Sequence, residues 1–223
     1  MFGAGFSPRY HWFWTGVNDD GLPRTTLSSA RTHRPLTLPV APGGGAWFPE
    51  SFSWSERYLG VELVGDTSPR VPYVIDLQTL QARALGEALP PSLRGGRLVP
   101  ARSVRIPSFD GKPVPAFLYS PASPETHAAI VSVHGGPTSQ SLRRFTPFVQ
   151  YFVSKGYAVL VLNVRGSTGY GKSWTALDSK DFGGGPLKDV VACKQWLVEK
   201  IGAQPARIAI AGGSYGGYMV SRS

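Results

Sequence analysis

The chain has 223 residues, which is enough for one large domain or two small ones, and its apolar fraction of 42% is ordinary for a globular protein. Its net charge of +9 is uneven: residues 1–110 hold 11 basic and 9 acidic residues, whereas residues 111–223 hold 12 and 5. No dense run of lysine and arginine occurs, so the charge does not indicate a nucleic-acid or membrane surface.

Features of targeting, redox chemistry and metal binding are few. The N-terminus lacks the basic start and apolar core of a signal peptide, and no apolar run reaches the roughly 18 residues of a membrane helix, so we expect a soluble, cytoplasmic protein. The single cysteine, Cys193, excludes an intramolecular disulfide and is expected to be a buried apolar residue. Neither His11 nor His33 has a partner at metal-ligand spacing, and we predict no metal or cofactor.

The first hundred residues contain a repeat. The stretch Phe6-Ser-Pro-Arg-Tyr10 is matched by Trp54-Ser-Glu-Arg-Tyr58, which begins 48 residues later. A period of 40–50 residues built from short strands and turns is typical of β-propeller blades. Residues 72–85 fit this interpretation, with two short strands around a turn at 76–79. We therefore predict about two blades, with two unrelated hairpins as the alternative.

A link rich in proline, glycine and arginine at residues 90–100 marks the predicted boundary between a domain at 1–99 and one at 100–223. The second domain alternates apolar strands with amphipathic helices, which predicts a doubly wound α/β sheet. Asp189 is expected in the first turn of the second helix, where it would suit the helix dipole. The predicted strands are 103–106, 114–119, 129–133, 158–162 and 208–211, the first two joined by an Asp110-Gly111 turn, and the predicted helices are 145–153 and 187–201.

The last predicted strand runs into the pattern G-x-S-x-G, spelled Gly212-Gly-Ser-Tyr-Gly216. This pattern is the nucleophile elbow, a sharp turn between a strand and a helix that exposes the serine hydroxyl above a sheet. The residues two before and two after the serine crowd the turn and must be small, which Gly212 and Gly216 satisfy. We therefore predict Ser214 to be a nucleophile.

Two further motifs also follow predicted strands. His134-Gly-Gly-Pro137 comes directly after the strand at 129–133, and in esterases the loop at this place lends a backbone N–H to the oxyanion hole. Asn163-Val-Arg-Gly-Ser-Thr-Gly-Tyr-Gly171 comes directly after the strand at 158–162. All three motifs should therefore open at the carboxyl edge of the sheet, where α/β proteins bind ligands.

Together the three motifs resemble the catalytic domain of the prolyl oligopeptidase family of serine peptidases. The Gly212-Gly-Ser-Tyr-Gly-Gly-Tyr-Met219 form is most similar to its acylaminoacyl-peptidase-like branch. The resemblance covers roughly residues 100–221. It implies the N-terminal half of an α/β-hydrolase domain, preceded by about two blades of a β-propeller. It also implies hydrolysis of peptide bonds in short peptides, with the propeller restricting access by large proteins.

The resemblance assigns roles to individual residues. Ser214 would attack a carbonyl and form an acyl-enzyme. The backbone N–H of Tyr215 and the hydroxyl of Tyr170 would stabilise the developing oxyanion. We expect Arg165 to hold its loop in place. His134 is expected to shape the glycine-rich loop that follows it rather than to act as the general base.

The chain departs from the family pattern in one respect. In α/β-hydrolases the catalytic acid and histidine follow the serine in the sequence. The four histidines at positions 11, 33, 127 and 134 all precede Ser214, so no residue here can fill the usual place of the triad acid or base. We therefore expect a fragment of a peptidase that is inactive by itself.

Two other functions remain open. An esterase would share the elbow, and a non-catalytic remnant could persist as a binding module. A dinucleotide-binding turn is disfavoured because Ser214 stands where G-x-G-x-x-G has its second glycine. We expect short peptides as substrates and neither nucleic acid nor membrane as a partner. Cleavage-site preference and oligomeric state do not follow from the sequence.

Overall fold

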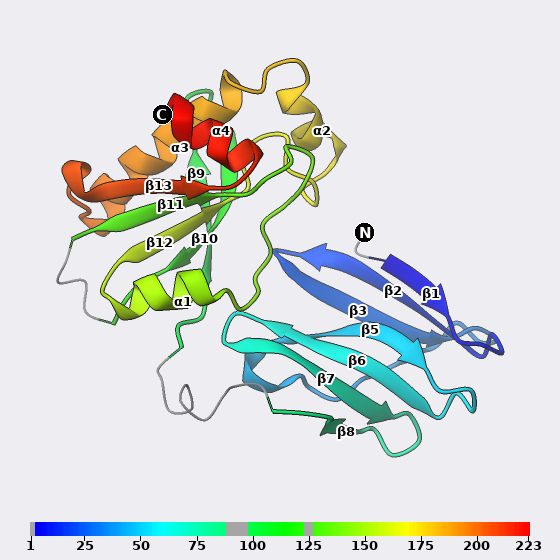
Figure 1. Ribbon diagram of the computed structural model, residues 1–223. Helices are drawn as coiled ribbons and strands as arrows, with labels where there is room; N and C mark the ends of the chain where they lie inside the picture. Colours follow the sequence, from blue (N-terminus) through cyan, green and yellow to red (C-terminus); the bar gives the residue numbers. More distant parts are fainter. Residues whose placement is uncertain (1–2, 88–97, 123–126) are drawn as a thin grey trace. The chain divides into compact units, whose positions relative to one another are not determined.

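The computed structural model describes residues 3–87, 98–122 and 127–223, which fall into two compact units (Figure 1). Unit 1 comprises Met1–Gly96 and Leu142–Thr146, and unit 2 comprises Arg97–Ser141 and Pro147–Ser223. Most of the predicted link at 90–100 lies outside the described residues, so the domain limits at 99 and 100 remain a prediction.

Unit 1 contains two four-stranded antiparallel sheets whose strands follow one another in sequence order (Figure 1). The first sheet consists of β1 (Gly3–Phe6), β2 (Trp12–Asp19), β3 (Leu22–Ser29) and β4 (Pro35–Leu36), and the second of β5 (Ala46–Phe52), β6 (Tyr58–Gly65), β7 (Ser68–Asp76) and β8 (Gln81–Ala84). One blade of a β-propeller is a sheet of four antiparallel strands in sequence order. The sheets are therefore consistent with the expected blades, although two sheets alone show no closed ring.

The two sheets repeat, but in a different register from the one predicted. In the first sheet the N–H of Tyr10 donates to the carbonyl of Ser7, and in the second the N–H of Glu56 donates to the carbonyl of Ser53. Tyr10 and Glu56 share an unusual left-handed backbone, with φ of 59° and 58°. The equivalent turns are thus 46 residues apart, and the sequence match at 48 residues was wrong. The sequence carries this period as well, because Phe6-Ser7 recurs as Phe52-Ser53 and Pro23-Arg24 recurs as Pro69-Arg70, each 46 residues later.

Unit 1 is held together by apolar side chains from both sheets. The rings of Trp14 and Phe48 meet edge to face with centroids 5.9 Å apart, and the Thr25 hydroxyl donates to the Trp47 carbonyl at 2.7 Å. Burial of such side chains supplies most of the stabilisation of a small β unit. The buried members of this core are Leu27, Trp47, Leu59, Val61, Leu63, Ile75 and Leu77.

Five residues from the second half of the sequence belong to unit 1. Within Leu142–Thr146, Arg143 forms an ion pair with Asp66 at 2.7 Å, and its N–H donates to the carbonyl of Gly21 at 2.9 Å. Asp66 is almost fully buried, so the guanidinium group compensates a carboxylate that burial would otherwise destabilise. A short segment between two elements of unit 2 is thereby fixed on unit 1.

Unit 2 is built on a five-stranded mixed sheet with the order β13-β11-β12-β10-β9. Its strands are β9 (Arg102–Pro107), β10 (Pro113–Tyr119), β11 (Ala129–Val133), β12 (Ala158–Leu162) and β13 (Ile208–Gly212). β11, β12 and β13 run parallel, and β9 and β10 form the antiparallel hairpin that the Asp110-Gly111 turn predicts. The strands expected from the sequence are confirmed.

Helices cover both faces of this sheet (Figure 1). α1 packs against one face with Phe117 and Val159, whereas α3 and α4 pack against the other with Val131 and Leu160. Strand residues alternate between the two cores, as the period of a β-strand requires. The helical elements are α1 (Pro147–Ser154), α2 (Lys172–Thr175), η3 (Ala176–Asp178), α3 (Gly185–Trp196), the π-helical turn η4 (Leu197–Ile201), η5 (Pro205–Arg207) and α4 (Tyr215–Arg222).

Two expectations about the helices were wrong. The first helix was predicted from residue 145 but begins at Pro147, because the residue before a proline is disfavoured in helical conformation. Phe145 consequently lies in the segment that belongs to unit 1. Asp189 is not in a first helical turn, because α3 already begins at Gly185 and buries Asp189 completely.

Among the described residues, no helix combines the length and apolarity needed to span a membrane. The same ranges contain no cluster of histidine, cysteine, aspartate and glutamate that could hold a metal ion. Cys193 is fully buried in the core beneath α3, as expected.

Candidate active site

The three sequence motifs begin side by side at one edge of the sheet. Val133, the last residue of β11, pairs with Leu162 on β12 and with Gly212 on β13. These three strands are parallel, so the residues that follow them emerge at the same carboxyl edge, where α/β sheets place their ligand sites. The expected convergence of the three loops is therefore confirmed.

Ser214 occupies the turn between β13 and α4. Its backbone has φ 54° and ψ −120°, a conformation that residues with a side chain rarely adopt. Such a residue persists only where its surroundings enforce the conformation, and backbone strain of this kind costs about 1–3 kcal/mol. The side chain of Ser214 is exposed, and within the described part of the chain its hydroxyl forms no hydrogen bond. The serine is thus presented in the manner of a nucleophile elbow.

The two glycines that flank Ser214 are required by close backbone contacts. A Cβ atom on Gly212 would lie 2.6 Å from the carbonyl carbon of Gly216, and one on Gly216 would lie 2.3 Å from the carbonyl oxygen of Val133. Both distances are far below van der Waals contact. By contrast, a Cβ atom on Gly213 would have no neighbour within 4 Å. The pattern G-x-S-x-G therefore reflects packing on both sides of the turn.

The glycine-rich loop after β11 lies next to the candidate nucleophile. A Cβ atom on Gly135 would lie 3.4 Å from Cβ of Ser214 and 3.9 Å from its Oγ. The first motif and the elbow are thus brought together, as the sequence predicts. The loop is close enough for its backbone to contribute to binding at Ser214.

Tyr215 begins α4, so its N–H has no carbonyl one turn earlier within the helix to accept it. This is the donor expected for the oxyanion. The Tyr215 side chain has a separate role: it is buried, and its hydroxyl donates to the carbonyl of Phe182 at 2.8 Å. Burial and nearby carboxylates raise the pKa of Tyr215 to about 12, so the phenol stays protonated and keeps this hydrogen bond.

Tyr170 is held by the residue that opens its own motif. Its hydroxyl oxygen accepts a hydrogen bond from Nδ2 of Asn163 at 3.1 Å. Asn163 is completely buried and also accepts the N–H of Ser141 at 2.7 Å, which fixes the orientation of its amide. The guanidinium of Arg105 stands 5.7 Å from the centroid of the Tyr170 ring. Tyr170 is therefore fixed near the carboxyl edge, and its approach to a substrate oxygen remains a prediction.

His134 is bound to its own loop and to the neighbouring one. Its Nδ1 lies 2.6 Å from the carbonyl oxygen of Gly135, and its Nε2 lies 2.8 Å from Oγ of Ser167. Burial lowers the pKa of His134 and outweighs the opposing effect of the Gly135 carbonyl, so the imidazole is neutral at neutral pH. This arrangement supports a loop-shaping role and not that of a base acting on Ser214.

Arg165 lies at the centre of a buried ionic network. Its Nη2 is 2.8 Å from Oδ1 of Asp189 and 3.1 Å from Oδ1 of Asp110, and its side chain is only 6% exposed. The hydroxyl of Ser108 also donates to Asp189 at 2.5 Å. Burial would lower the pKa of Arg165, but the two carboxylates raise it above its ordinary value. Arg165 thus ties the loop after β12 to α3 and to the β9–β10 turn.

Sequence reasoning anticipated the structural role of Arg165 but missed its partners. Asp189 lies 24 positions from Arg165, and Asn163 appeared only as the first letter of a motif. One signal was available for Asn163: a polar residue directly after an apolar strand often contributes to a binding edge.

No general base for Ser214 is apparent among the described residues. His127 precedes β11 and so lies at the opposite end of that strand from His134. His11 is paired with Glu56 in unit 1, and the ring of His33 packs against Phe13 in the same unit. The described residues therefore hold an exposed serine in an elbow, with the N–H of Tyr215 beside it, and no histidine placed to accept the serine proton.

A strand–serine–helix elbow at the carboxyl edge of a helix-covered sheet is the arrangement found in α/β-hydrolases. Residues 143–222 match the prolyl oligopeptidase family, which confirms the peptidase family inferred from the three motifs. A dipeptidyl aminopeptidase of Pseudoxanthomonas mexicana is 35% identical over 175 residues, covering 74% of this chain and 24% of the relative. An acylamino-acid-releasing enzyme of Arabidopsis thaliana is 36% identical over 92 residues, covering 41% of this chain and 12% of the relative.

The fold is similar over nearly the whole chain to solved peptidases. A puromycin-hydrolyzing peptidase of Mycobacterium tuberculosis superimposes with a TM-score of 0.80 at 26% identity, covering 96% of this chain and 34% of that chain. The chain thus spans at most about a quarter of the length of the curated relatives described here and a third of this structure. The activity of a whole enzyme is accordingly a matter for proposal.

Proposed function

We propose that the chain carries the nucleophile-bearing part of a serine peptidase that cleaves short peptides through an acyl-enzyme. The observation that carries this proposal is the backbone of Ser214, with φ 54° and ψ −120°, at the start of α4. Gly212 and Gly216 pack so closely that the turn can hardly adopt another backbone conformation. The similarity to acylamino-acid-releasing enzymes and dipeptidyl aminopeptidases supports a peptide substrate over a simple ester.

In the proposed reaction, Oγ of Ser214 attacks the carbonyl carbon of the scissile peptide bond. The serine proton passes to a histidine base supplied from outside this chain and then to the leaving amine, while the carbonyl oxygen becomes an oxyanion. The N–H of Tyr215 and the hydroxyl of Tyr170 stabilise that oxyanion. Water then attacks the acyl-enzyme, releases the acid product and restores the serine hydroxyl.

The domain organisation proposed from the sequence accompanies this function. Residues 1–99 form blades from the C-terminal part of a β-propeller, and residues 100–223 form the N-terminal half of an α/β-hydrolase domain. Two consecutive four-stranded antiparallel sheets and a mixed sheet covered on both faces support this division. A cytoplasmic location accords with the sequence, and the oligomeric state is left open.

We further propose that these 223 residues are inactive alone. An unassisted serine hydroxyl is a weak nucleophile at neutral pH. The histidine nearest to Ser214 in sequence, His134, is occupied by Gly135 and Ser167. Activity would then require a histidine base and an acid that follow Ser214, as they do in α/β-hydrolases.

The test measures hydrolysis of an aminoacyl peptide and of an acyl ester by two preparations. One is the 223-residue chain, and the other is this chain joined to the C-terminal half of a related peptidase. We expect turnover only in the joined protein, with the peptide preferred over the ester. Ser214→Ala should abolish turnover. The exposed Ser221, also on α4, provides the matched control Ser221→Ala, which should leave turnover unchanged.

If the joined protein hydrolysed the acyl ester faster than the peptide, the result would favour an esterase function instead. If both Ser214→Ala and Ser221→Ala kept full activity, Ser214 would have no part in the mechanism. Turnover by the 223-residue chain that disappears in Ser214→Ala would contradict the proposed inactivity while supporting the nucleophile.

A further inference from the structure

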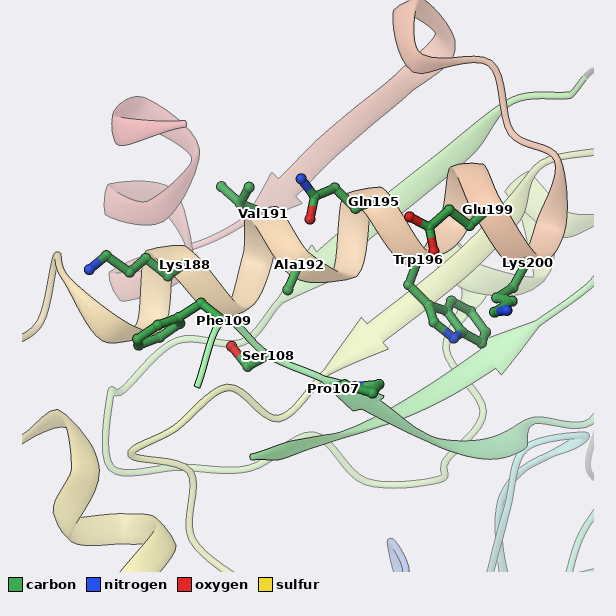
Figure 2. Close-up of a pocket in the computed structure, with 10 residues that line it drawn as sticks. All are labelled: Pro107, Ser108, Phe109, Lys188, Val191, Ala192, Gln195, Trp196, Glu199 and Lys200. Atoms are coloured by element: carbon green, nitrogen blue, oxygen red, sulfur yellow. The ribbon is translucent and has the colours of Figure 1, made fainter. Parts of the chain in front are cut away.

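A groove runs between α3 and the end of β9, and it shares no residue with the elbow. Its volume is about 490 Å³, which lies within the usual range of ligand pockets. Figure 2 shows Pro107 and Ser108 along one side and the helix residues Ala192 and Trp196 facing them. The floor of the groove is thus largely apolar.

Two large apolar side chains at the groove remain unusually open to solvent. Phe109 is 54% exposed and Val191 is 49% exposed. Apolar side chains that gather at one concave site, rather than lying scattered, mark surfaces that bind a partner. Both are rigid, with few rotatable bonds, so ordering them on binding costs little entropy.

The two ends of the groove carry ammonium groups. Figure 2 shows Lys188 at one end, beside Phe109, and Lys200 at the other, beyond Trp196. The Lys188 ammonium lies 4.8 Å from the centroid of the Phe109 ring, and the Arg165 guanidinium lies 4.5 Å from it. Arg165 is already paired with Asp189 and Asp110, so the cation that this end of the groove offers a ligand is the exposed Lys188.

The spacing of the lysines matches an extended peptide. Lys188 and Lys200 are twelve residues apart on a continuous helical stretch, or roughly 18 Å at 1.5 Å per residue. An extended peptide advances about 3.3 Å per residue, so carboxylates five to six residues apart would reach both ammonium groups. Gln195 and Glu199 lie on the rim in Figure 2 and offer oxygen acceptors for the backbone N–H groups of such a peptide.

We propose that this groove binds an extended acidic segment of a partner protein, with an apolar side chain between two carboxylates. The carboxylates pair with Lys188 and Lys200, and the apolar side chain packs between Phe109, Val191 and Trp196. The excess of basic residues in 111–223 attracts such a segment during its approach. The carboxylate of Glu199 disfavours a third acidic residue near the centre and so contributes specificity.

The probe is a synthetic hexapeptide with both ends blocked, glutamate at positions 1 and 6, leucine at position 3 and serine elsewhere. Its binding to the 223-residue chain is measured by fluorescence anisotropy of an attached dye. We expect saturable binding with Kd below about 1 mM in low salt, and weaker binding at about 0.5 M salt because the charges are exposed. Replacing the leucine by serine, or both glutamates by glutamine, should weaken binding at least about fivefold.

The variants Lys188→Glu and Lys200→Glu should each weaken binding at least about fivefold, because reversal turns an attraction into a repulsion. Lys194 is also exposed on α3 but does not line the groove, so Lys194→Glu is the matched control and should change Kd less than twofold. Val191→Ser should weaken binding of the peptide with leucine at position 3 but not of the peptide with serine at that position. Circular dichroism checks that each variant is folded.

Three outcomes would overturn the proposal. The first is that the hexapeptide shows no saturable binding. The second is that Lys194→Glu loses as much affinity for the hexapeptide as Lys188→Glu and Lys200→Glu do. The third is self-association in sedimentation experiments that Lys188→Glu abolishes, because a second copy of the chain would then occupy the groove. None of these outcomes bears on Ser214, so the proposal stands or falls independently of the peptidase function.

Discussion

The contact between the elbow helix and β11 allows the effect of one methyl group to be estimated. In Gly216→Ala the new Cβ would lie 2.3 Å from the carbonyl oxygen of Val133 and 3.1 Å from its carbonyl carbon. Ordinary carbon–oxygen contacts are about 3.3 Å or longer, so the overlap is about 1 Å. The obstructing atoms belong to the backbone of a central strand, and no side-chain rotation can relieve the clash.

Overpacking of a rigid site costs about 1–3 kcal/mol, and we expect the upper end of that range here. A loss of about 3 kcal/mol would lower the folding constant of unit 2 more than a hundredfold. The matched control is Gly213→Ala, because its Cβ meets no atom within 4 Å and its φ is not in the left-handed region. That variant should stay within about 0.5 kcal/mol of the parent chain.

The assay is guanidinium denaturation followed by circular dichroism, combined with hydrogen exchange of peptides from β11 and β13. Exchange of these strands reports the stability of unit 2 separately from that of unit 1. Gly216→Ala should speed their exchange strongly, and Gly213→Ala should not. Equal exchange and equal stability of the two variants would refute the packing argument for the elbow.

Three further predictions concern the surrounding structure. Asp189→Asn removes the more buried of the two carboxylates that pair with Arg165 and leaves only Asp110, so it should cost about 1–3 kcal/mol in denaturation, whereas Lys194→Gln on the same helix should cost less than about 0.5 kcal/mol. Tyr215→Phe removes the hydrogen bond to Phe182 and should cost about 1 kcal/mol without altering the reactivity of Ser214, because the proposed oxyanion donor is the backbone N–H. Burial alone would raise the pKa of Glu56, but hydrogen bonds from Ser7, the Arg9 N–H and His11 hold it below its ordinary value of 4.5. The stabilisation is therefore complete above that value and is lost as the pH falls through the lower folded pKa, so the thermal stability advantage over Glu56→Gln should shrink as the pH falls below 4.5.

Much of unit 2 could be predicted because its signals are local. Buried parallel strands are continuous apolar runs, and glycines around Ser214 reveal a turn that tolerates no side chain. The contacts of Gly212 and Gly216 explain why this signal was reliable. Contacts between residues that are far apart in the sequence were harder to predict. The pairing of Arg165 with Asp189 depends on how α3 packs on the sheet, which no local pattern encodes.

Unit 1 shows why a true repeat can be read in the wrong register. The three identities at an offset of 48 residues are chance matches, whereas the true offset of 46 relates Phe6-Ser7 to Phe52-Ser53 and Pro23-Arg24 to Pro69-Arg70. Glu56 was not expected in a left-handed turn, a position that favours glycine and asparagine. Its buried carboxylate is stabilised there by the N–H of Arg9 and by His11, contacts that only the folded chain creates.

The central claim is that Ser214 becomes a nucleophile once a histidine base is supplied. The most direct measurement is mass spectrometric mapping of a fluorophosphonate adduct on the joined protein and on the 223-residue chain. We predict an adduct on the peptide that contains Ser214 in the joined protein and little or none in the 223-residue chain. An adduct confined to another serine, or no adduct on Ser214 in a folded joined protein, would contradict the account.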